Sequence, residues 1–156
     1  MKLNKDLKIS IIGLGYVGLP LAIEFSKLYE VVGYDINNKR IKALNQYNDI
    51  TDETSSKSLK KALSKNLKIT SLESDISNSD VFIVTVPTPI TEKKIPDLSY
   101  LKSASRTVGS YLKPDNVVIF ESTVYPGCTE EDCVPILEAE SKLVYKQDFH
   151  CGYSPE

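Results

Sequence analysis

The sequence predicts an α/β fold, a single domain built on a doubly wound parallel sheet of the Rossmann type. Short apolar runs alternate with stretches of helical period, and strands that alternate with helices form parallel sheets. The first apolar run is followed by Gly13, Gly15 and Gly18 in the spacing G-x-G-x-x-G. The second run ends in an acid, Asp35, about twenty residues later. These observations indicate a dinucleotide-binding domain, which we expect to span residues 1–156.

Length, charge and cysteine content exclude several classes of protein. A chain of 156 residues is long enough for one domain with its own core. The formal net charge of -2, without a Lys/Arg cluster, argues against nucleic acid as a partner. No apolar run is long enough to span a membrane and the first residues lack a secretory signal, so we expect a cytoplasmic protein without a membrane partner. Cys128, Cys133 and Cys151 lack metal-ligand spacing, which predicts free thiols and no metal site; a Cys/His site at His150 and Cys151 is the alternative.

The first strand and helix enclose the glycines. Lys8–Ile12 is a β-branched run, typical of a strand buried on both faces. From Tyr16 onward the pattern becomes helical. The expected apolar stripe of this helix consists of Leu19, Ala22, Ile23 and Leu28.

Each glycine of the turn has a separate predicted task. Gly13 makes the tight turn, Gly15 lets a pyrophosphate approach the backbone, and Gly18 lets the helix pack closely on the strand. Backbone amides and the positive end of the helix dipole then face the phosphates. We therefore expect these glycines, with Tyr16 and Val17 between them, to bind the dinucleotide.

The second strand, Val31–Asp35, predicts which dinucleotide is bound. A carboxylate at its end accepts the hydroxyls of the adenosine ribose and would repel a 2′-phosphate, so Asp35 favours NAD over NADP. Asn37 or Asn38 is expected to cap the next helix. Arg40 on that helix has two open interpretations: it reaches the adenosine of the cofactor, or it is a solvated surface charge.

The middle of the chain contains the least regular segment. Gln46–Ser58 is polar without apolar periodicity and predicts a surface loop. A short helix over Leu59–Leu63 and a short strand over Leu67–Thr70 are expected to follow.

Ser79–Val86 is the clearest strand after the first, and it ends at a pair of prolines. Proline cannot continue a central ladder, so the strand must stop at Pro87. Ligands of open parallel sheets bind beyond the carboxyl ends of the strands. Pro87 and Thr88 are therefore predicted at the cofactor crevice.

The last part of the chain repeats this pattern. Asp97 is expected to cap a helix that runs to Leu112. A buried strand over Val117–Phe120 then opens into a polar segment, where Ser122 and Thr123 join the predicted cofactor-binding residues. A helix capped by Thr129 or a neighbour, and a final strand over Phe149–Tyr153, complete the expected order.

Four segments resemble, in the same order, motifs of the UDP-glucose/GDP-mannose dehydrogenase family. They are Gly13–Pro20, Val86–Pro89, Glu121–Gly127 and Gly152–Glu156. The resemblance covers the whole chain but only the amino-terminal cofactor domain of that family. The segment 121–137 looks most like the branch that oxidises UDP-N-acetylglucosamine or UDP-N-acetylgalactosamine.

The resemblance implies an activity and two catalytic residues. Such enzymes oxidise the C6 alcohol of a UDP-sugar to a carboxylate with two NAD in succession, and we expect the full-length enzyme to be a homodimer. By resemblance, Thr123 positions a water or oxyanion near C6, and Glu156 of the S-P-E motif assists the proton transfers. Without the resemblance, Thr123 is read as an ordinary loop residue and Glu156 as a solvated acid.

The resemblance also implies what this chain does not contain. The nucleophilic cysteine of the family, its partner residues, the central dimerising helix and the UDP-binding domain belong to later segments. None of the three cysteines lies in the family's cysteine motif. We therefore expect an excised cofactor domain that is inactive alone.

Two other interpretations stay open. A stand-alone nucleotide-sensing module shares the Gly-rich turn and the acid, but has no need of Pro87–Pro89 or of Ser122–Gly127. Another NAD-linked hydroxyacid or hydroxyacyl dehydrogenase shares the turn but not Ser154–Glu156.

Overall fold

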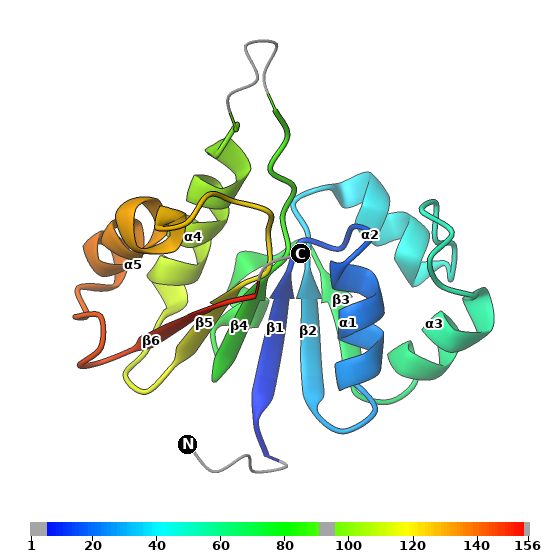
Figure 1. Ribbon diagram of the computed structural model, residues 1–156. Coiled ribbons are helices and arrows are strands. Elements are labelled where there is room, and N and C mark those ends of the chain that lie inside the picture. The colour runs from blue at the N-terminus through cyan, green and yellow to red at the C-terminus, as the bar shows by residue number, and fades with distance from the viewer. Residues whose placement is uncertain (1–5, 91–95, 155–156) are drawn as a thin grey trace.

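A six-stranded parallel sheet forms the centre of the computed structural model, which describes residues 6–90 and 96–154. The strand order is β3-β2-β1-β4-β5-β6, and all neighbours are parallel, so the carboxyl ends lie along one edge (Figure 1). This is the Rossmann order and confirms the predicted fold class. The strands are β1 Lys8–Ile12, β2 Glu30–Tyr34, β3 Leu67–Thr70, β4 Val81–Val84, β5 Val117–Phe120 and β6 His150–Tyr153.

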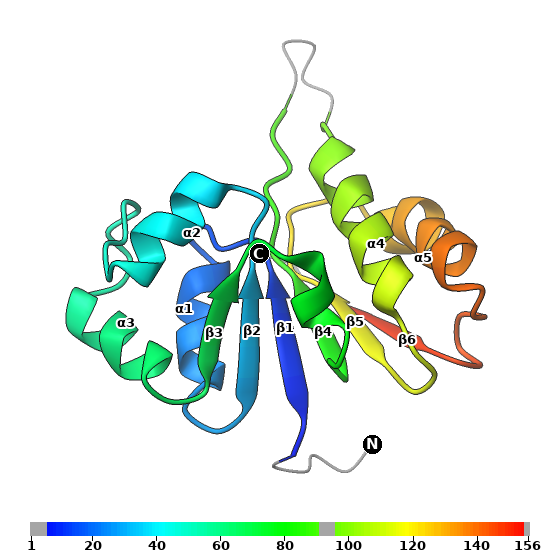
Figure 2. The same cartoon turned by 180° about the vertical axis from the view of Figure 1, so that it is seen from behind.

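Helices cover both faces of the sheet. Figures 1 and 2 show α1, α2 and α3 over the half that contains β2 and β3, and α4 and α5 over the half that contains β5 and β6. The helices are α1 Gly18–Phe25, α2 Asn38–Asn45, α3 Ser56–Leu63, α4 Ser99–Tyr111 and α5 Val134–Ser141. Two shorter turns are the 3₁₀ turn η1 Glu73–Ile76 and the π-helical turn η2 Thr129–Cys133. No helix in the described ranges is long and apolar enough to cross a membrane.

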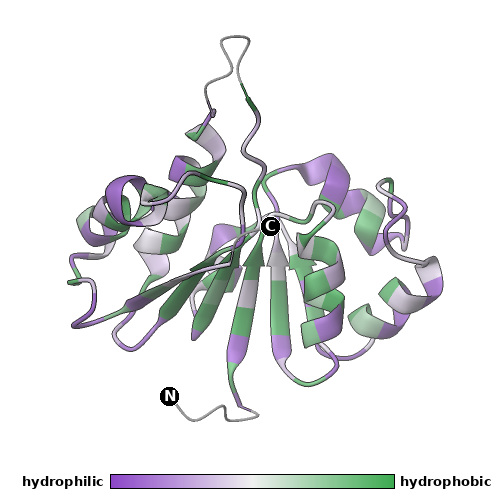
Figure 3. Cartoon of the chain, in the orientation of Figure 1, coloured by the Kyte–Doolittle hydropathy of each residue, from purple (hydrophilic) through white to green (hydrophobic). Residues whose placement is uncertain are grey.

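Each face of the sheet carries its own hydrophobic core. Successive side chains of a strand point to opposite faces, so a strand covered on both sides must be apolar throughout. On β4, Val81 and Ile83 belong to the core beneath α1, α2 and α3, whereas Phe82 and Val84 belong to the core beneath α4 and α5. All four side chains are buried, and Figure 3 shows the central strands as mainly hydrophobic.

Helix boundaries confirm some predicted caps and correct others. The Asn37 side chain caps α2, where its Oδ1 accepts hydrogen bonds from two backbone amides. The cap predicted at Asp97 is one residue early, because Leu98 is the N-cap of α4, although the Asp97 carboxylate accepts a hydrogen bond from the Ser99 amide. The cap predicted at Thr129 is wrong, because Thr129 begins the π-turn and α5 starts only at Val134. Leu28 lies beyond the end of α1 and is 67% exposed, so its predicted place on the apolar stripe is also wrong.

Candidate cofactor site

The candidate site lies where the chain changes direction across the sheet. β1 pairs with β2 on one side and with β4 on the other, and the helices that follow β1 and β4 cover opposite faces. Ligands of open α/β sheets bind at this switch point. A pocket of about 640 Å³ lies there, between the Gly-rich turn, the ends of β2 and β4, and α4. A second hollow of about 680 Å³ lies between α1 and α3, away from the strand ends, so we place the cofactor in the first.

The three glycines meet three different requirements. Gly13 has a φ of +98°, which side chains rarely tolerate, and its amide donates to the Tyr34 carbonyl at 2.8 Å. A Cβ on Gly18 would lie 1.9 Å from the Gly13 carbonyl oxygen, so only glycine allows α1 to approach the turn this closely. A Cβ on Gly15 would meet nothing within 4 Å. The tasks of Gly13 and Gly18 are confirmed, and the open space at Gly15 fits a pyrophosphate against the backbone.

Thr85, directly after β4, supports the turn from the neighbouring strand. Its Oγ1 donates to the Gly13 carbonyl at 2.7 Å and is itself buried under α1. Thr85 was not among the site residues predicted from the sequence. It could have been noticed as a hydroxyl residue within an otherwise apolar segment that ends at Pro87.

The carboxylate of Asp35 lies at the pocket, as predicted, and also supports the turn. One oxygen accepts from the Leu14 amide at 2.8 Å, and the other accepts from the Asn37 amide at 2.8 Å. Each carboxylate oxygen has a second lone pair, so both remain able to accept from ribose hydroxyls. Asp35 therefore has a structural task besides the one expected for it.

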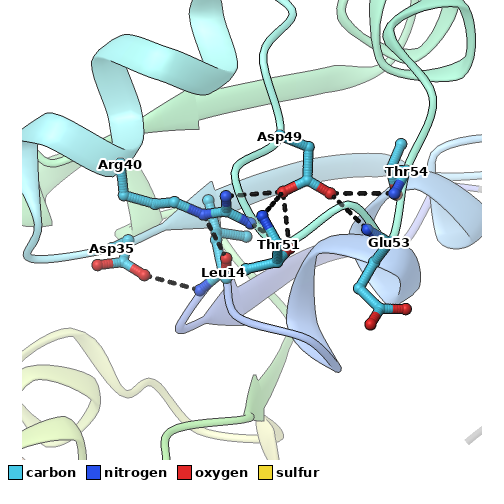
Figure 4. Close-up of polar contacts among 7 residues, drawn as sticks. All are labelled: Leu14, Asp35, Arg40, Asp49, Thr51, Glu53 and Thr54. Carbon is cyan, nitrogen blue, oxygen red and sulfur yellow. Dashed lines mark hydrogen bonds and ion pairs between the residues drawn. The ribbon is translucent and has the colours of Figure 1, made fainter.

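Arg40 is buried, which excludes the interpretation as a solvated surface charge. Only 5% of the residue is exposed, and its Nε donates to the Leu14 carbonyl at 2.9 Å. Its Nη1 lies 2.7 Å from the Oδ1 of Asp49, and its Nη2 donates to the Thr51 hydroxyl (Figure 4). Part of the polar stretch predicted as a surface loop thus folds over Arg40, with the Asp49 side chain only 1% exposed.

The ends of β4 and β5 are joined by side-chain hydrogen bonds. Thr88 Oγ1 donates to the Thr123 carbonyl at 2.7 Å, and Ser122 Oγ donates to the Val86 carbonyl at 2.9 Å. Pro87 lines the pocket, and the Thr123 side chain is exposed at the same edge of the sheet. Tyr16 is 69% exposed just before α1. Glu156 lies outside the described residues.

One face of α4 forms a wall of the pocket, and this wall was not predicted from the sequence. Tyr100, Ser103 and Thr107 line the pocket, and the Tyr34 hydroxyl there donates to Glu73 at 3.2 Å. Burial and the negative charge of Glu73 raise the pKa of Tyr34 to about 12, so its hydroxyl stays protonated at neutral pH. The apolar periodicity of α4 predicts only which residues are buried, and no sequence motif indicates that its polar residues line a site.

Comparison with known proteins assigns this arrangement to a family. Residues 7–156 match the NAD-binding domain of the UDP-glucose/GDP-mannose dehydrogenases. The chain belongs to the UDP-glucose/GDP-mannose dehydrogenase family. Its cofactor is accordingly NAD, as the Gly-rich turn and Asp35 predicted.

Individual relatives support the same assignment. The chain is 55% identical, over 152 residues, to UDP-N-acetyl-D-glucosamine 6-dehydrogenase of Pseudomonas aeruginosa, covering 97% of this chain and 36% of the relative. The structure of UDP-D-ManNAc dehydrogenase from Pyrococcus horikoshii matches with a TM-score of 0.90 and 41% identity, covering 96% of this chain and 36% of that one. A ternary complex of GDP-mannose dehydrogenase from Pseudomonas aeruginosa matches with a TM-score of 0.87 and 30% identity, covering 95% and 36%. The chain thus spans about a third of the length of these relatives.

The three cysteines of this NAD-binding domain are free thiols, as predicted. Cys128 precedes η2 and Cys133 is its last residue; both are buried, and Cys151 on β6 is partly buried. Burial raises the pKa of Cys133 and of Cys151 to about 12, which keeps both as thiols rather than thiolates. The described residues also contain no group of three or more His, Cys, Asp or Glu side chains arranged to hold a metal ion.

Proposed function

We propose that the chain is the cofactor-binding part of an enzyme that oxidises the C6 alcohol of a UDP-N-acetylhexosamine to a uronate, using two NAD. The observation that carries the proposal is the combination of an open Gly-rich turn at the switch point with 55% identity to a UDP-N-acetyl-D-glucosamine 6-dehydrogenase. Because the chain covers 36% of that relative, the substrate and the complete reaction are attributed to a longer protein.

The residues proposed to hold NAD divide the pocket into three parts. Gly13, Gly15 and Gly18, with the backbone of Tyr16 and Val17, would face the pyrophosphate. Asp35 and Arg40 lie at the end of the pocket next to β2, where the adenosine ribose would be bound. Pro87, Thr88, Ser122 and Thr123 lie beyond β4 and β5, on the side proposed for the nicotinamide.

Thr123 and Glu156 are the proposed catalytic residues. The hydrogen bond from Thr88 fixes the backbone of Thr123 while its side chain stays exposed, which suits a hydroxyl that orients a water or an oxyanion. Bound NAD supplies the hydride acceptor. Glu156 is proposed to accept the proton that leaves the C6 hydroxyl.

Two properties of the complete enzyme belong to the same proposal. We attribute to it a homodimeric state and a cytoplasmic location, on the ground of the family resemblance. The chain by itself is proposed to be inactive, because positioning of the substrate can supply about 7–11 kcal/mol of the barrier and depends on a domain that grips the UDP group.

The test is NADH formation from three candidate sugars. UDP-N-acetylglucosamine, UDP-N-acetylgalactosamine and UDP-glucose are assayed with the 156-residue chain and with the complete reading frame. We expect NADH from the complete enzyme, fastest with a UDP-N-acetylhexosamine, and none from the chain alone. Robust turnover by residues 1–156 would overturn the proposal that this chain binds NAD but needs a further domain for catalysis. It would also require a nucleophile within this chain. NAD binding without turnover by the complete enzyme would favour a nucleotide-sensing module.

A further inference from the structure

Two oppositely charged side chains hold the backbone of the same residue in the Gly-rich turn. Asp35 accepts from the Leu14 amide at 2.8 Å, and Arg40 donates to the Leu14 carbonyl at 2.9 Å. Both line the pocket at the end proposed for the adenosine ribose. An arginine at this place is the group that accommodates the 2′-phosphate of NADP, because its guanidinium binds phosphate oxygens in a bidentate manner.

A second carboxylate, that of Asp49, faces the same guanidinium. Its Oδ1 lies 2.7 Å from Arg40 Nη1, with side-chain exposures of 6% for Arg40 and 1% for Asp49. The carboxylate is fixed by the Thr51 hydroxyl at 2.7 Å and by the amides of Glu53 and Thr54 (Figure 4). Burial alone would raise the pKa of Asp49, but the hydrogen bonds from Thr51 and Arg40, together with the charge of Arg40, outweigh it and hold the pKa below its ordinary value. Asp49 is therefore ionised at neutral pH.

All three nitrogens of the Arg40 guanidinium face oxygen atoms of the protein. The buried Nη1 lies 2.7 Å from the Asp49 carboxylate, and Nε and Nη2 donate to the Leu14 carbonyl and the Thr51 hydroxyl. At this contact the charge of Asp49 balances that of the guanidinium. A 2′-phosphate at Asp35 would meet one cation whose charge is already compensated, and two carboxylates.

We propose that Asp49 is a specificity-determining residue, which favours NAD over NADP by neutralising Arg40. Asp35 disfavours the 2′-phosphate directly, whereas Asp49 acts through the guanidinium that would otherwise attract it. Asp49 lies in a polar loop, and its carboxylate is linked to the Gly-rich turn through Arg40, which donates to the Leu14 carbonyl. The inference rests on the proposal that the pocket holds a dinucleotide with its ribose at Asp35.

The test compares the dissociation constants of NAD and NADP, measured by calorimetry, in matched variants. Asp49→Asn keeps the shape and the oxygen that faces Arg40 but removes the charge. Glu53→Gln removes the charge of an exposed carboxylate from the same loop and is the control. We expect the ratio of the NADP constant to the NAD constant to fall by about tenfold in Asp49→Asn, the effect of one charge-assisted hydrogen bond. The ratio should not change in Glu53→Gln.

A ratio distinguishes a specificity role from a structural one. If Asp49 only supported the turn, both cofactors would bind more weakly by the same factor and the ratio would stay constant, which would overturn the proposal. The double variant Asp49→Asn/Arg40→Gln should lose the gain in NADP binding. If the gain persisted there, another cation such as Lys39 would be responsible, and the role given to Arg40 would be wrong.

A second variant decides the matter if Asp49→Asn does not fold. Arg40→Gln removes the guanidinium, whereas Asp49 keeps its hydrogen bonds from Thr51, Glu53 and Thr54, so the carboxylate charge at the pocket is left uncompensated. We expect it to raise the ratio of the NADP constant to the NAD constant. An unchanged or lowered ratio would contradict the proposal. Failure of the wild-type chain to bind NAD would instead overturn the proposed function, which keeps the two failures distinguishable.

Discussion

At the scale of single residues, Gly15 and Gly18 offer a matched pair of substitutions. A side chain on Gly15 would enter open space, so Gly15→Val should fold but block the approach of the pyrophosphate. NAD should raise the melting temperature of the wild-type chain and leave that of Gly15→Val unchanged, because only a ligand of the native state stabilises it. An equal shift in both proteins would show that the phosphates lie elsewhere.

Gly18→Val is the counterpart with the opposite expectation. Its Cβ would overlap the Gly13 carbonyl oxygen and Thr85 Oγ1, at 1.9 Å and 2.4 Å, so the backbone must move. Overpacking of this kind costs about 1–3 kcal/mol or more of the free energy of unfolding. Urea denaturation should show this loss for Gly18→Val and a much smaller one for Gly15→Val. Equal losses would contradict the assignment of separate tasks to the two glycines.

Asp49 makes the free energy of unfolding of the chain depend on pH under acidic conditions. Its native pKa is lowered below 3.8, so the unfolded state takes up a proton first as the pH falls. The stabilisation is therefore complete above about pH 5 and is lost as the pH falls through the native pKa. Asp49→Asn should reduce the free energy of unfolding by up to ~3–5 kcal/mol at neutral pH. The difference from wild type should shrink on acidification, whereas a difference that stayed constant would refute an ionised Asp49.

Some properties of single residues could be predicted from the sequence, and others could not. The glycines and Asp35 could be predicted because each requirement, a positive φ, a close approach or a charge at a strand end, is local to one motif. The burial of Arg40 could not, because its partner Asp49 belongs to a polar stretch without periodicity. Only the folded loop brings the two charges together.

At the scale of elements, the contact between α4 and α5 depends on Gly109. A Cβ there would lie 2.7 Å from the Cβ of Glu140 on α5, closer than packed side chains allow. Gly109→Val should lower the free energy of unfolding by about 1–3 kcal/mol through overpacking. Ser110→Val, on the exposed face of the same helix, should change it by less than about 0.5 kcal/mol. Urea denaturation of both variants makes the comparison, and equal losses would contradict the role given to Gly109 in the packing of α4 on α5.

Elements with a strong apolar pattern were predicted well, and those shaped by packing were not. β3 and β5 match the expected strands at both ends. β5 is a nearly continuous β-branched run, and β3 alternates the buried Leu67 and Ile69 with an exposed lysine, as a strand does. The π-turn η2 has no such signal: Thr129–Cys133 is mostly acidic and reads as the first turn of an ordinary helix. Its wider winding delays the start of α5 to Val134, where a proline in the first turn is tolerated.

At the scale of the whole molecule, the sheet with its two cores should be able to fold without further domains. Helices cover both faces, and the strand that lies at the switch point, β4, is buried on both sides. The pocket proposed for the cofactor is lined by residues from β1 and β2 on one side and from α4 on the other. We therefore expect these 156 residues to bind NAD without a further domain.

Calorimetric titration of the isolated chain with NAD, and separately with NADP, measures whether it binds a dinucleotide and which one it prefers. We predict saturable binding of NAD at a single site, tighter than that of NADP by roughly tenfold to hundredfold, the effect of one charge-assisted hydrogen bond. The preference is read on one protein, so the support that Asp35 gives to the turn does not confound it, as it would in an Asp35→Ala variant. A folded chain that binds neither dinucleotide, or binds both equally, would contradict the account.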